Sequence, residues 1–184
     1  MRATQLLMEE HEIILRGLRV LNALADRAAR GAEVPAKAIG DALDFLTQFA
    51  DIHHHNKEEE ILFPALEEAG YPRDAGPVGV MLHEHLQGRG LIRALRAAAP
   101  QAAGDAGARA RFADTARAYT ALLSAHIDKE NQIIFPMADR AIDGEARQRV
   151  EAEFDTFERA AAARRTQQED AVAKLLLELL PEEP

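Results

Sequence analysis

The stretch DIHHHNKEEEILFP, residues 51 to 64, places three consecutive histidines beside a lysine and three glutamates, followed by an apolar tail and a proline. A related pattern, HIDKENQIIFP, occupies residues 126 to 136. An overlay of the two stretches aligns His54 with His126, Lys57 with Lys129, Glu58 with Glu130, Phe63 with Phe135 and Pro64 with Pro136. This repetition is the strongest feature of the sequence, because it places the same ionisable groups in two separate helical patterns.

The composition favours a helical protein with a single domain. The chain has 184 residues, of which 47% are hydrophobic and only 5% aromatic. Alanine, leucine, glutamate and arginine dominate and favour helix, whereas tryptophan is absent and valine is scarce, so little argues for strands. A chain of this length can bury a real core.

Several classes of function are disfavoured. The chain has no cysteine, which excludes disulfides, thiolate ligands and cysteine nucleophiles, so a metal site must use histidine nitrogen and carboxylate oxygen. The net charge of −9 opposes nucleic-acid binding. The start, MRATQLLMEEHE, has no apolar signal-peptide core, and no run is long enough to span a bilayer. We therefore expect a cytoplasmic protein that binds neither nucleic acid nor membrane.

Hydrophobic periodicity predicts five helices. They are expected at about residues 4–30, 35–66, 78–98, 108–141 and 145–180, with Gly31 as a stop, and with connections at 69–77 and 100–107. Pro64 and Pro136 lie inside helical patterns, so each should kink its helix or change its register. Four long helices with short connections predict an all-α fold, an antiparallel up-down four-helix bundle.

The last helix is expected to lie outside that bundle. We assign residues 1–142 to the bundle and residues 143–184 to an additional C-terminal helix. This helix would pack on the bundle or mediate self-association, which the leucine-rich end KLLLELLPEEP fits. The chain would accordingly be a monomer or a homodimer.

The repeated pairs have the spacing of a metal site. Residues four apart lie on one helix face, about 6 Å apart, so His54 with Glu58, and His126 with Glu130, can each offer an imidazole and a carboxylate to one volume. Their helix stripes are otherwise apolar, and charge buried there costs several kcal/mol unless it is paired or metal-bound. A solvated face with i,i+4 ion pairs is the less favoured interpretation.

Two further histidines fit the same geometry. His11 lies among leucines of the first helix and His85 lies near the start of the third, so each helix of the bundle supplies one inward histidine. A lone histidine of this kind is usually a hydrogen-bonded core residue, and only the set makes ligation the better reading. Four imidazoles and two bridging carboxylates predict a dinuclear site in the bundle core. Nitrogen and oxygen ligands suit iron, manganese or zinc.

The sequence resembles the bacterial hemerythrin-like proteins, also called HHE cation-binding domains. The resemblance rests on MEEHEII, FADIHHHNKEEEILFPALEEAGYPRDAGPVGVMLHEHLQGRGLIRAL and YTALLSAHIDKENQIIFPMADR, which cover residues 8 to about 140. It implies an antiparallel four-helix bundle with a non-haem di-iron centre, two iron ions per chain, with manganese or zinc as substitutes. The implied ligands are His11, His54, Glu58, His85, His126 and Glu130.

The sequence also departs from the oxygen-carrying members of that family. Those proteins have a His-x3-His pair in the third helix, whereas here the positions four before and after His85 are Met81 and Arg89. Their last pair is His-x4-Asp instead of His-x3-Glu. The smaller ligand set resembles iron-sulfur-cluster repair proteins, whose cysteine-containing N-terminal segment is absent from this sequence. Fewer protein ligands leave positions for water, O2, peroxide or NO.

Other polar residues carry weaker expectations. His55 is a candidate additional ligand, although His53 and His55 are expected not to share a face with His54. Tyr119 is either a core aromatic or a phenol beside the metals, and Arg89 either pairs with Glu58 or Glu130 or lines an access path. The remaining expectations are surface positions or support beside the ligands for Glu59 and Glu60, and an outer position for His83.

The leading expectation is a di-iron protein that binds or reacts with O2, H2O2 or NO. It would store or sense the small molecule, or it would be an enzyme with peroxide- or oxygen-dependent redox activity. The alternative is an iron donor or storage protein in iron-sulfur cluster repair or iron homeostasis, and a metal-free structural bundle ranks last. The sequence shows no pocket for an organic substrate.

Overall fold

The computed structural model describes residues 1–102 and 105–180, which are helical and contain no strand. Three segments are π-helical, with wider turns than an α-helix, and are labelled η. In chain order the elements are α1 (Arg2–Ala29), α2 (Ala36–Phe45), η1 (Leu46–His55), η2 (Glu58–Leu62), α3 (Phe63–Glu68), α4 (Gly76–Ala102), α5 (Ala106–Lys129), η3 (Glu130–Ile134), α6 (Phe135–Ala141) and α7 (Gly144–Leu179).

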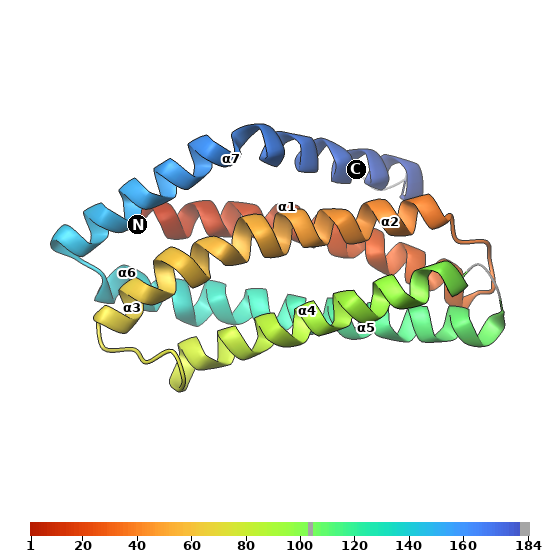
Figure 1. Ribbon diagram of the computed structural model, residues 1–184, viewed down its shortest axis with the longest axis horizontal. Coiled ribbons are helices and arrows are strands. Elements are labelled where there is room, and N and C mark those ends of the chain that lie inside the picture. The colour runs from red at the N-terminus through yellow and green to blue at the C-terminus, as the bar shows by residue number, and fades with distance from the viewer. Residues whose placement is uncertain (103–104, 181–184) are drawn as a thin grey trace.

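The predicted antiparallel four-helix bundle is confirmed. Its four rods are α1, the run from α2 to α3, α4, and the run from α5 to α6, and successive rods point in opposite directions (Figure 1). Contacts join α1 to α5, α5 to α4, α4 to α2, and α2 to α1, which closes the ring of four.

The predicted helix boundaries are mostly correct. Gly31 follows the end of α1 with a φ of 72°, the left-handed conformation that glycine adopts without a Cβ clash. The break predicted near Pro100 is two residues too early, since α4 continues to Ala102 because a proline near the end of a helix removes only one hydrogen bond. Part of the connection predicted at 100–107, residues 103–104, lies outside the described residues.

Both repeated prolines coincide with a change of helix type, as predicted. Pro64 and Pro136 stand within the first two positions of α3 and α6, directly after η2 and η3. A proline has no backbone N–H and clashes with the preceding turn, and a wider turn relieves that conflict. The rods therefore continue through both prolines with a shifted register.

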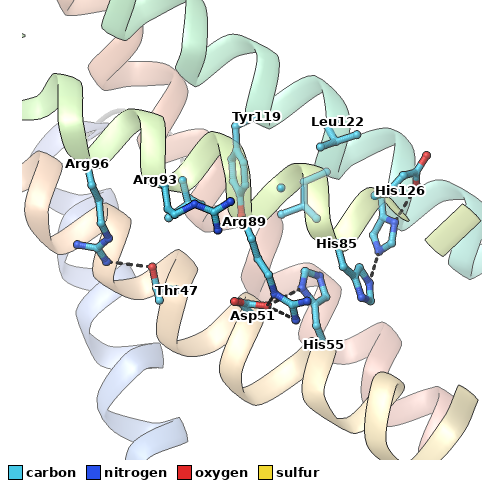
Figure 2. Close-up of a pocket in the computed structure, with 14 residues that line it drawn as sticks. Thr47, Asp51, His55, His85, Arg89, Arg93, Arg96, Tyr119, Leu122 and His126 are labelled. Carbon is cyan, nitrogen blue, oxygen red and sulfur yellow. Dashed lines mark hydrogen bonds and ion pairs between the residues drawn. The ribbon is translucent and has the colours of Figure 1, made fainter. Parts of the chain in front are cut away.

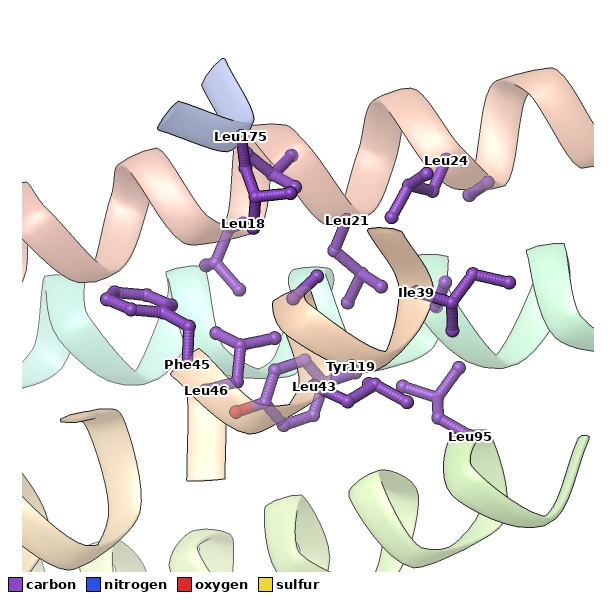
Figure 3. Close-up of a cluster of buried hydrophobic side chains, with 14 of the residues drawn as sticks. Leu18, Leu21, Leu24, Ile39, Leu43, Phe45, Leu46, Leu95, Tyr119 and Leu175 are labelled. Carbon is purple, nitrogen blue, oxygen red and sulfur yellow. The ribbon is translucent and has the colours of Figure 1, made fainter. Parts of the chain in front are cut away.

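The core consists of two apolar clusters separated by a polar layer. One cluster joins α1, α2, η1, α4, α5 and α7, and Figure 3 shows Leu18 and Leu21 of α1 with Leu43 and Leu46 among its members. The second cluster, which includes Leu7, lies toward the other end. Between the two clusters every rod crosses a layer of buried charged and polar side chains, which include His11, His54, Glu58, His85, His126 and Glu130.

The C-terminal helix α7 packs along the outside of the bundle, over α1 and α2 (Figure 1). Val150 and Phe154 join one apolar cluster, and Val172 and Leu175 join the other. This packing matches one of the two arrangements expected for the helix, while its role in self-association stays a prediction. Residues 181–184 of the expected acidic tail lie outside the described residues.

In the described ranges, the structure contains no helix with the length and apolarity needed to cross a membrane. The cytoplasmic location stays a prediction.

Candidate metal centre

The six predicted ligands meet in the polar layer, although they come from four rods. Nε2 of His11 and Nε2 of His126 each lie 3.1 Å from a different oxygen of Glu130. Nε2 of His54 and Nε2 of His85 each lie 3.5 Å from a different oxygen of Glu58. Each carboxylate therefore lies between two histidines, one toward each end of the pair, which is the arrangement of a bridging ligand.

The ligand atoms form two adjacent groups that could each hold a cation. The first consists of His11, His54, Glu58 and Glu130, and the second of His55, Glu58, His85 and His126. Within each group one atom per residue lies within 4.8 Å of the corresponding atoms of the others, and all of the residues are buried. Glu58 belongs to both groups, and Glu130 offers its second oxygen to His126 of the second group.

Several inward atoms of this cluster form no hydrogen bond with the described part of the chain. Nε2 of His11, Nε2 of His54, both nitrogens of His55 and all four oxygens of Glu58 and Glu130 are buried without one. Buried polar atoms in native proteins are nearly always satisfied, because each unpaired one costs about 1–3 kcal/mol. Several in one volume indicate that something is bound there.

The outward nitrogens of the four predicted histidine ligands are all satisfied. Each Nδ1 donates to an acceptor at 2.7 to 2.9 Å: His11 to Asn131, His54 to Glu10, His85 to Glu59 and His126 to Glu84. An acceptor at Nδ1 fixes the hydrogen there and leaves the lone pair on Nε2, which is directed inward. Histidines that bind metals are usually held by such acceptors.

One contact is unfavourable unless a cation or proton lies nearby. Nε2 of His85 and Nε2 of His126 are 3.1 Å apart. Since both rings already donate from Nδ1, two lone pairs face each other in the neutral tautomers. A shared cation removes this repulsion, so the donor set fits a bound metal better than it fits an empty polar core.

His55 lies against the second group, contrary to the expectation that it could not share a face with His54. Its ring stacks on His85 with centroids 4.0 Å apart, and it lies 5.6 Å from the ring of His54. Both histidines end the π-helical segment η1, in which one turn is spread over more residues, so that neighbouring side chains diverge less.

His53 faces the opposite way, toward α1 and α7. Its Nε2 lies 3.0 Å from Glu10 and 3.2 Å from Glu158. Lys57, which is fully buried, forms ion pairs with the same two glutamates. Although Glu10, His53 and Glu158 could hold a cation by their spacing, the ammonium group of Lys57 and the guanidinium of Arg165 already compensate the two carboxylates.

Arg89 supports the second group indirectly. It pairs with Asp51 at 2.7 Å and with Glu59 at 2.8 Å (the pair with Asp51 is visible in Figure 2), instead of with Glu58 or Glu130 as one interpretation expected. Asp51 lies 3.5 Å from Nδ1 of His55, and Glu59 accepts from His85. Glu59 therefore holds the ring of His85, whereas Glu60 and His83 are exposed, and support of a metal ligand by Glu59 stays a prediction.

Tyr119 is buried and lines a cavity next to His85 and His126. The ring also belongs to an apolar cluster (Figure 3), as expected for a core aromatic, and its role beside metals stays a prediction. Burial raises the pKa of its hydroxyl, so the phenol stays protonated at neutral pH.

The two bridging carboxylates differ in their electrostatics. Burial, together with the nearby charge of Glu130, raises the pKa of Glu58 well above its usual value. Burial also acts on Glu130, but His126 and His11 outweigh it and lower the pKa of Glu130 well below its usual value. Burial thus favours the neutral form of Glu58, whereas the imidazoles beside Glu130 favour its charged form.

Three supporting residues were missed in the sequence: Glu10, Glu84 and Asn131. A signal existed for two of them, because Glu10-His11 and Glu84-His85 repeat the same dipeptide in the first and third helices. Their role depends on which rods are neighbours, which a single helix pattern cannot reveal.

The chain is similar in sequence to several known proteins. An uncharacterized protein of Mycobacterium tuberculosis, Rv1995, is 31% identical over 131 residues, which cover 71% of this chain and 51% of that protein. The iron-sulfur cluster repair protein YtfE of Edwardsiella ictaluri is 34% identical over 106 residues, covering 55% of this chain and 47% of that protein. This chain thus spans about half the length of the curated relatives it matches.

No solved structure matches the chain significantly. The family model described as the hemerythrin HHE cation binding domain matches residues 2–138, which include every residue of the two groups. With that match and a buried cluster of imidazoles and carboxylates at the centre of a four-helix bundle, the chain belongs to the hemerythrin HHE cation-binding domain family.

Proposed function

We propose that this chain holds two iron ions in the polar layer and uses them to bind or transform a small molecule such as O2, H2O2 or NO. The observation that carries the proposal is the set of buried, unpaired imidazole nitrogens and carboxylate oxygens directed at one volume. Nitrogen and oxygen donors without sulfur suit iron, with manganese or zinc as substitutes.

The proposed ligands divide into two positions. His11 and His54 would hold an ion at the first, His85 and His126 would hold an ion at the second, and Glu58 and Glu130 would be shared between the two. His55 is the additional ligand of the second position, since its unpaired nitrogens lie beside His85. Two carboxylates and neutral imidazoles leave a positive charge on two divalent ions, which favours an anionic or readily reduced ligand.

Bound iron would supply Lewis acidity and redox chemistry at these positions. The side chains of this chain perform the remaining tasks. The acceptors at each Nδ1 hold the rings in place, and the apolar clusters above and below the layer exclude bulk water. A cavity reaches His55, His85 and His126 and none of the other ligands, so a small molecule would enter at the second position.

Elemental analysis of protein produced in iron-replete cells tests the proposal. We expect two irons per chain, and clear loss of iron in His85→Ala. The matched control is His83→Ala, two residues away on the same helix, where the exposed ring is bonded only to Gln87. Iron content equal in the two variants, or an absence of iron in folded wild-type protein, would refute the proposal.

The reactions of the iron-loaded protein then distinguish between the possible functions of the centre. A reversible change in the absorption spectrum on adding and removing O2 supports storage or sensing. Turnover of H2O2 supports an enzyme.

An iron donor or storage protein is the second candidate. It is supported by the relatives named iron-sulfur cluster repair protein, although each covers little more than half of this chain. Rapid loss of iron to a chelator, with delivery to an apo iron-sulfur protein, would favour this candidate. Retention of iron against the chelator during many cycles of O2 exposure would favour the first.

A further inference from the structure

A cavity of about 240 Å³ lies between η1, α4 and α5 (Figure 2). Its inner wall consists of His55, His85 and His126, the histidines of the second position. A water molecule needs only on the order of 10 to 15 Å³ of such space, and a diatomic gas needs little more. The cavity is therefore far larger than a gas ligand requires, and the sequence-based expectation that no organic pocket exists needs correction.

The cavity has an apolar middle section. Ile92 of α4, together with Leu122 and Leu123 of α5, lines it beside the ring of Tyr119. Gly88 also lines it, and the missing side chain at this position keeps the cavity open. Such a section accommodates a short hydrocarbon chain or ring, and the polar lining groups near it, Asp51 and Arg89, are paired with each other.

The outer end carries a guanidinium group without an ion pair. Arg89 is paired with Asp51 and Glu59, and Arg96 is paired with Asp44. Arg93 lies between them on α4, is exposed, and has no ion pair or hydrogen bond to any of the residues that the structure describes. In a chain with a net charge of −9, an uncompensated cation at the rim of a cavity favours an anionic ligand.

The acidic residues of the cavity do not neutralise Arg93. Asp51 is held by Arg89, and Glu84 pairs with Lys129 and accepts from His126. A guanidinium presents a planar fork that fits a carboxylate with two parallel hydrogen bonds. The free group at the rim and the apolar section behind it thus match the two ends of one molecule.

We propose that this cavity binds a small organic carboxylate, with the carboxylate at Arg93 and the apolar part along Ile92, Leu122 and Leu123. Its far end would then meet the second position at His55, His85 and His126. Binding depends on the cavity alone, and only a reaction at the far end rests on the proposed iron centre. The ligand would be a substrate, or a molecule that controls access to the centre.

Isothermal titration calorimetry with acetate, butanoate, hexanoate and hexan-1-ol tests this, on both the iron-loaded and the chelator-treated protein. We expect affinity to rise about three- to fourfold for each added methylene that is buried. Hexanoate should bind at least about tenfold more tightly than hexan-1-ol, because only the carboxylate pairs with Arg93. Equal affinity for all four probes, or no binding, overturns the proposal.

Two pairs of variants locate the site. Arg93→Gln should weaken hexanoate binding about tenfold, whereas Arg140→Gln, which removes an exposed cation far along the chain, should not. Gly88→Leu should abolish binding: a Cβ there meets only Tyr119, at 3.7 Å, and the rest of the side chain enters the cavity. Gln87→Leu, at the exposed neighbouring position, should retain binding. Unchanged binding in both Arg93→Gln and Gly88→Leu overturns the proposal.

The iron content of each sample separates the two proposals. Protein with two irons that binds no carboxylate contradicts the cavity proposal and leaves the iron centre intact. Carboxylate binding that depends on Arg93, in protein that takes up no iron, contradicts the iron centre and supports the cavity proposal. Carboxylate binding that appears only with iron, and persists in Arg93→Gln, means that the probe ligates the metal directly and overturns the cavity proposal.

Discussion

Glu59 and Asn131 occupy equivalent positions in the repeat, and each accepts a hydrogen bond from a histidine of the other half of the bundle. Glu59 accepts from Nδ1 of His85 at 2.7 Å, and Asn131 accepts from Nδ1 of His11 at 2.8 Å. Phe63 and Phe135 follow the same rule, since they stack on His85 and His11. The two halves therefore cross-support each other, and they differ in that one acceptor is charged and the other neutral.

Loss of the neutral acceptor should weaken the first position. In Asn131→Leu, Nδ1 of His11 loses its partner, and the ring can turn away from Glu130. We expect iron affinity to fall about 10- to 100-fold, the usual effect of losing such support. Competition with a chelator measures it. Gln132→Leu, exposed and adjacent, is the control, and an equal loss in both variants would contradict the explanation.

Glu10 should contribute strongly to the stability of the fold, because it compensates the buried charged groups next to His54. Glu10 accepts hydrogen bonds from His53 and His54 and forms an ion pair with Lys57. Burial raises the pKa of Glu10, but these contacts outweigh burial and lower it. Glu10→Gln leaves a buried ammonium with only Glu158, so we expect a loss of about 3 kcal/mol in the free energy of unfolding. Urea unfolding measures this. The exposed neighbour in Glu9→Gln should change it by less than about 0.5 kcal/mol.

Glu158 should make the attachment of α7 sensitive to acid. Burial would raise its pKa, but His53 and Lys57 outweigh burial and lower the pKa of Glu158 from 4.5 to about 2. A carboxyl with a depressed folded-state pKa stabilises the protein above its unfolded pKa. This contribution, on the order of 2 to 3 kcal/mol, disappears as the pH falls from about 5 to 2.

Urea unfolding of Glu158→Gln at pH 7 and pH 3 tests this contribution. The variant should be less stable than the wild type at pH 7 and nearly equal to it at pH 3. Glu153→Gln, an exposed position on the same helix, should match the wild type at both values. A stability difference that is independent of pH would show that ionisation of Glu158 is not its cause.

Two glycines in helices should respond oppositely to alanine. A Cβ at Gly17 of α1 would stand 2.3 Å from Cε1 of the buried ring of Phe45, whereas a Cβ at Gly40 of α2 meets nothing within 4 Å. Gly17→Ala should cost about 1–3 kcal/mol through overpacking, and Gly40→Ala should gain about 0.5–1 kcal/mol through helix propensity. Thermal unfolding measures both. A gain at Gly17 would mean that the two rods separate easily.

Much of the centre could be predicted from local patterns. The i,i+4 spacing places His54 with Glu58, and His126 with Glu130, on single helix faces, and that relation does not depend on the rest of the fold. Both pairs are buried in one layer as expected. The bundle could be predicted for the same reason, because apolar periodicity and short connections are properties of consecutive residues.

The role of His55 could not be predicted from a regular helix. It requires the π-helical segment η1, whose wider turn brings adjacent histidines toward one volume. Helical periodicity assumes 3.6 residues per turn, so a local change of helix type escapes it. The burial of Lys57 likewise could not be predicted from the sequence, because its partners Glu10 and Glu158 come from α1 and α7.

The amino-acid sequence alone determined that four helices carry a repeated set of imidazoles and carboxylates on apolar faces, because these relations extend over one or two turns. Only the tertiary structure decided which atoms face one another across the rods, which acceptors hold each histidine, and that a cavity reaches one side of the centre past Arg93, which forms no ion pair with the described residues. These features arise from contacts between residues that are 26 to 120 positions apart. Their geometry depends on how whole helices pack, which no local pattern specifies.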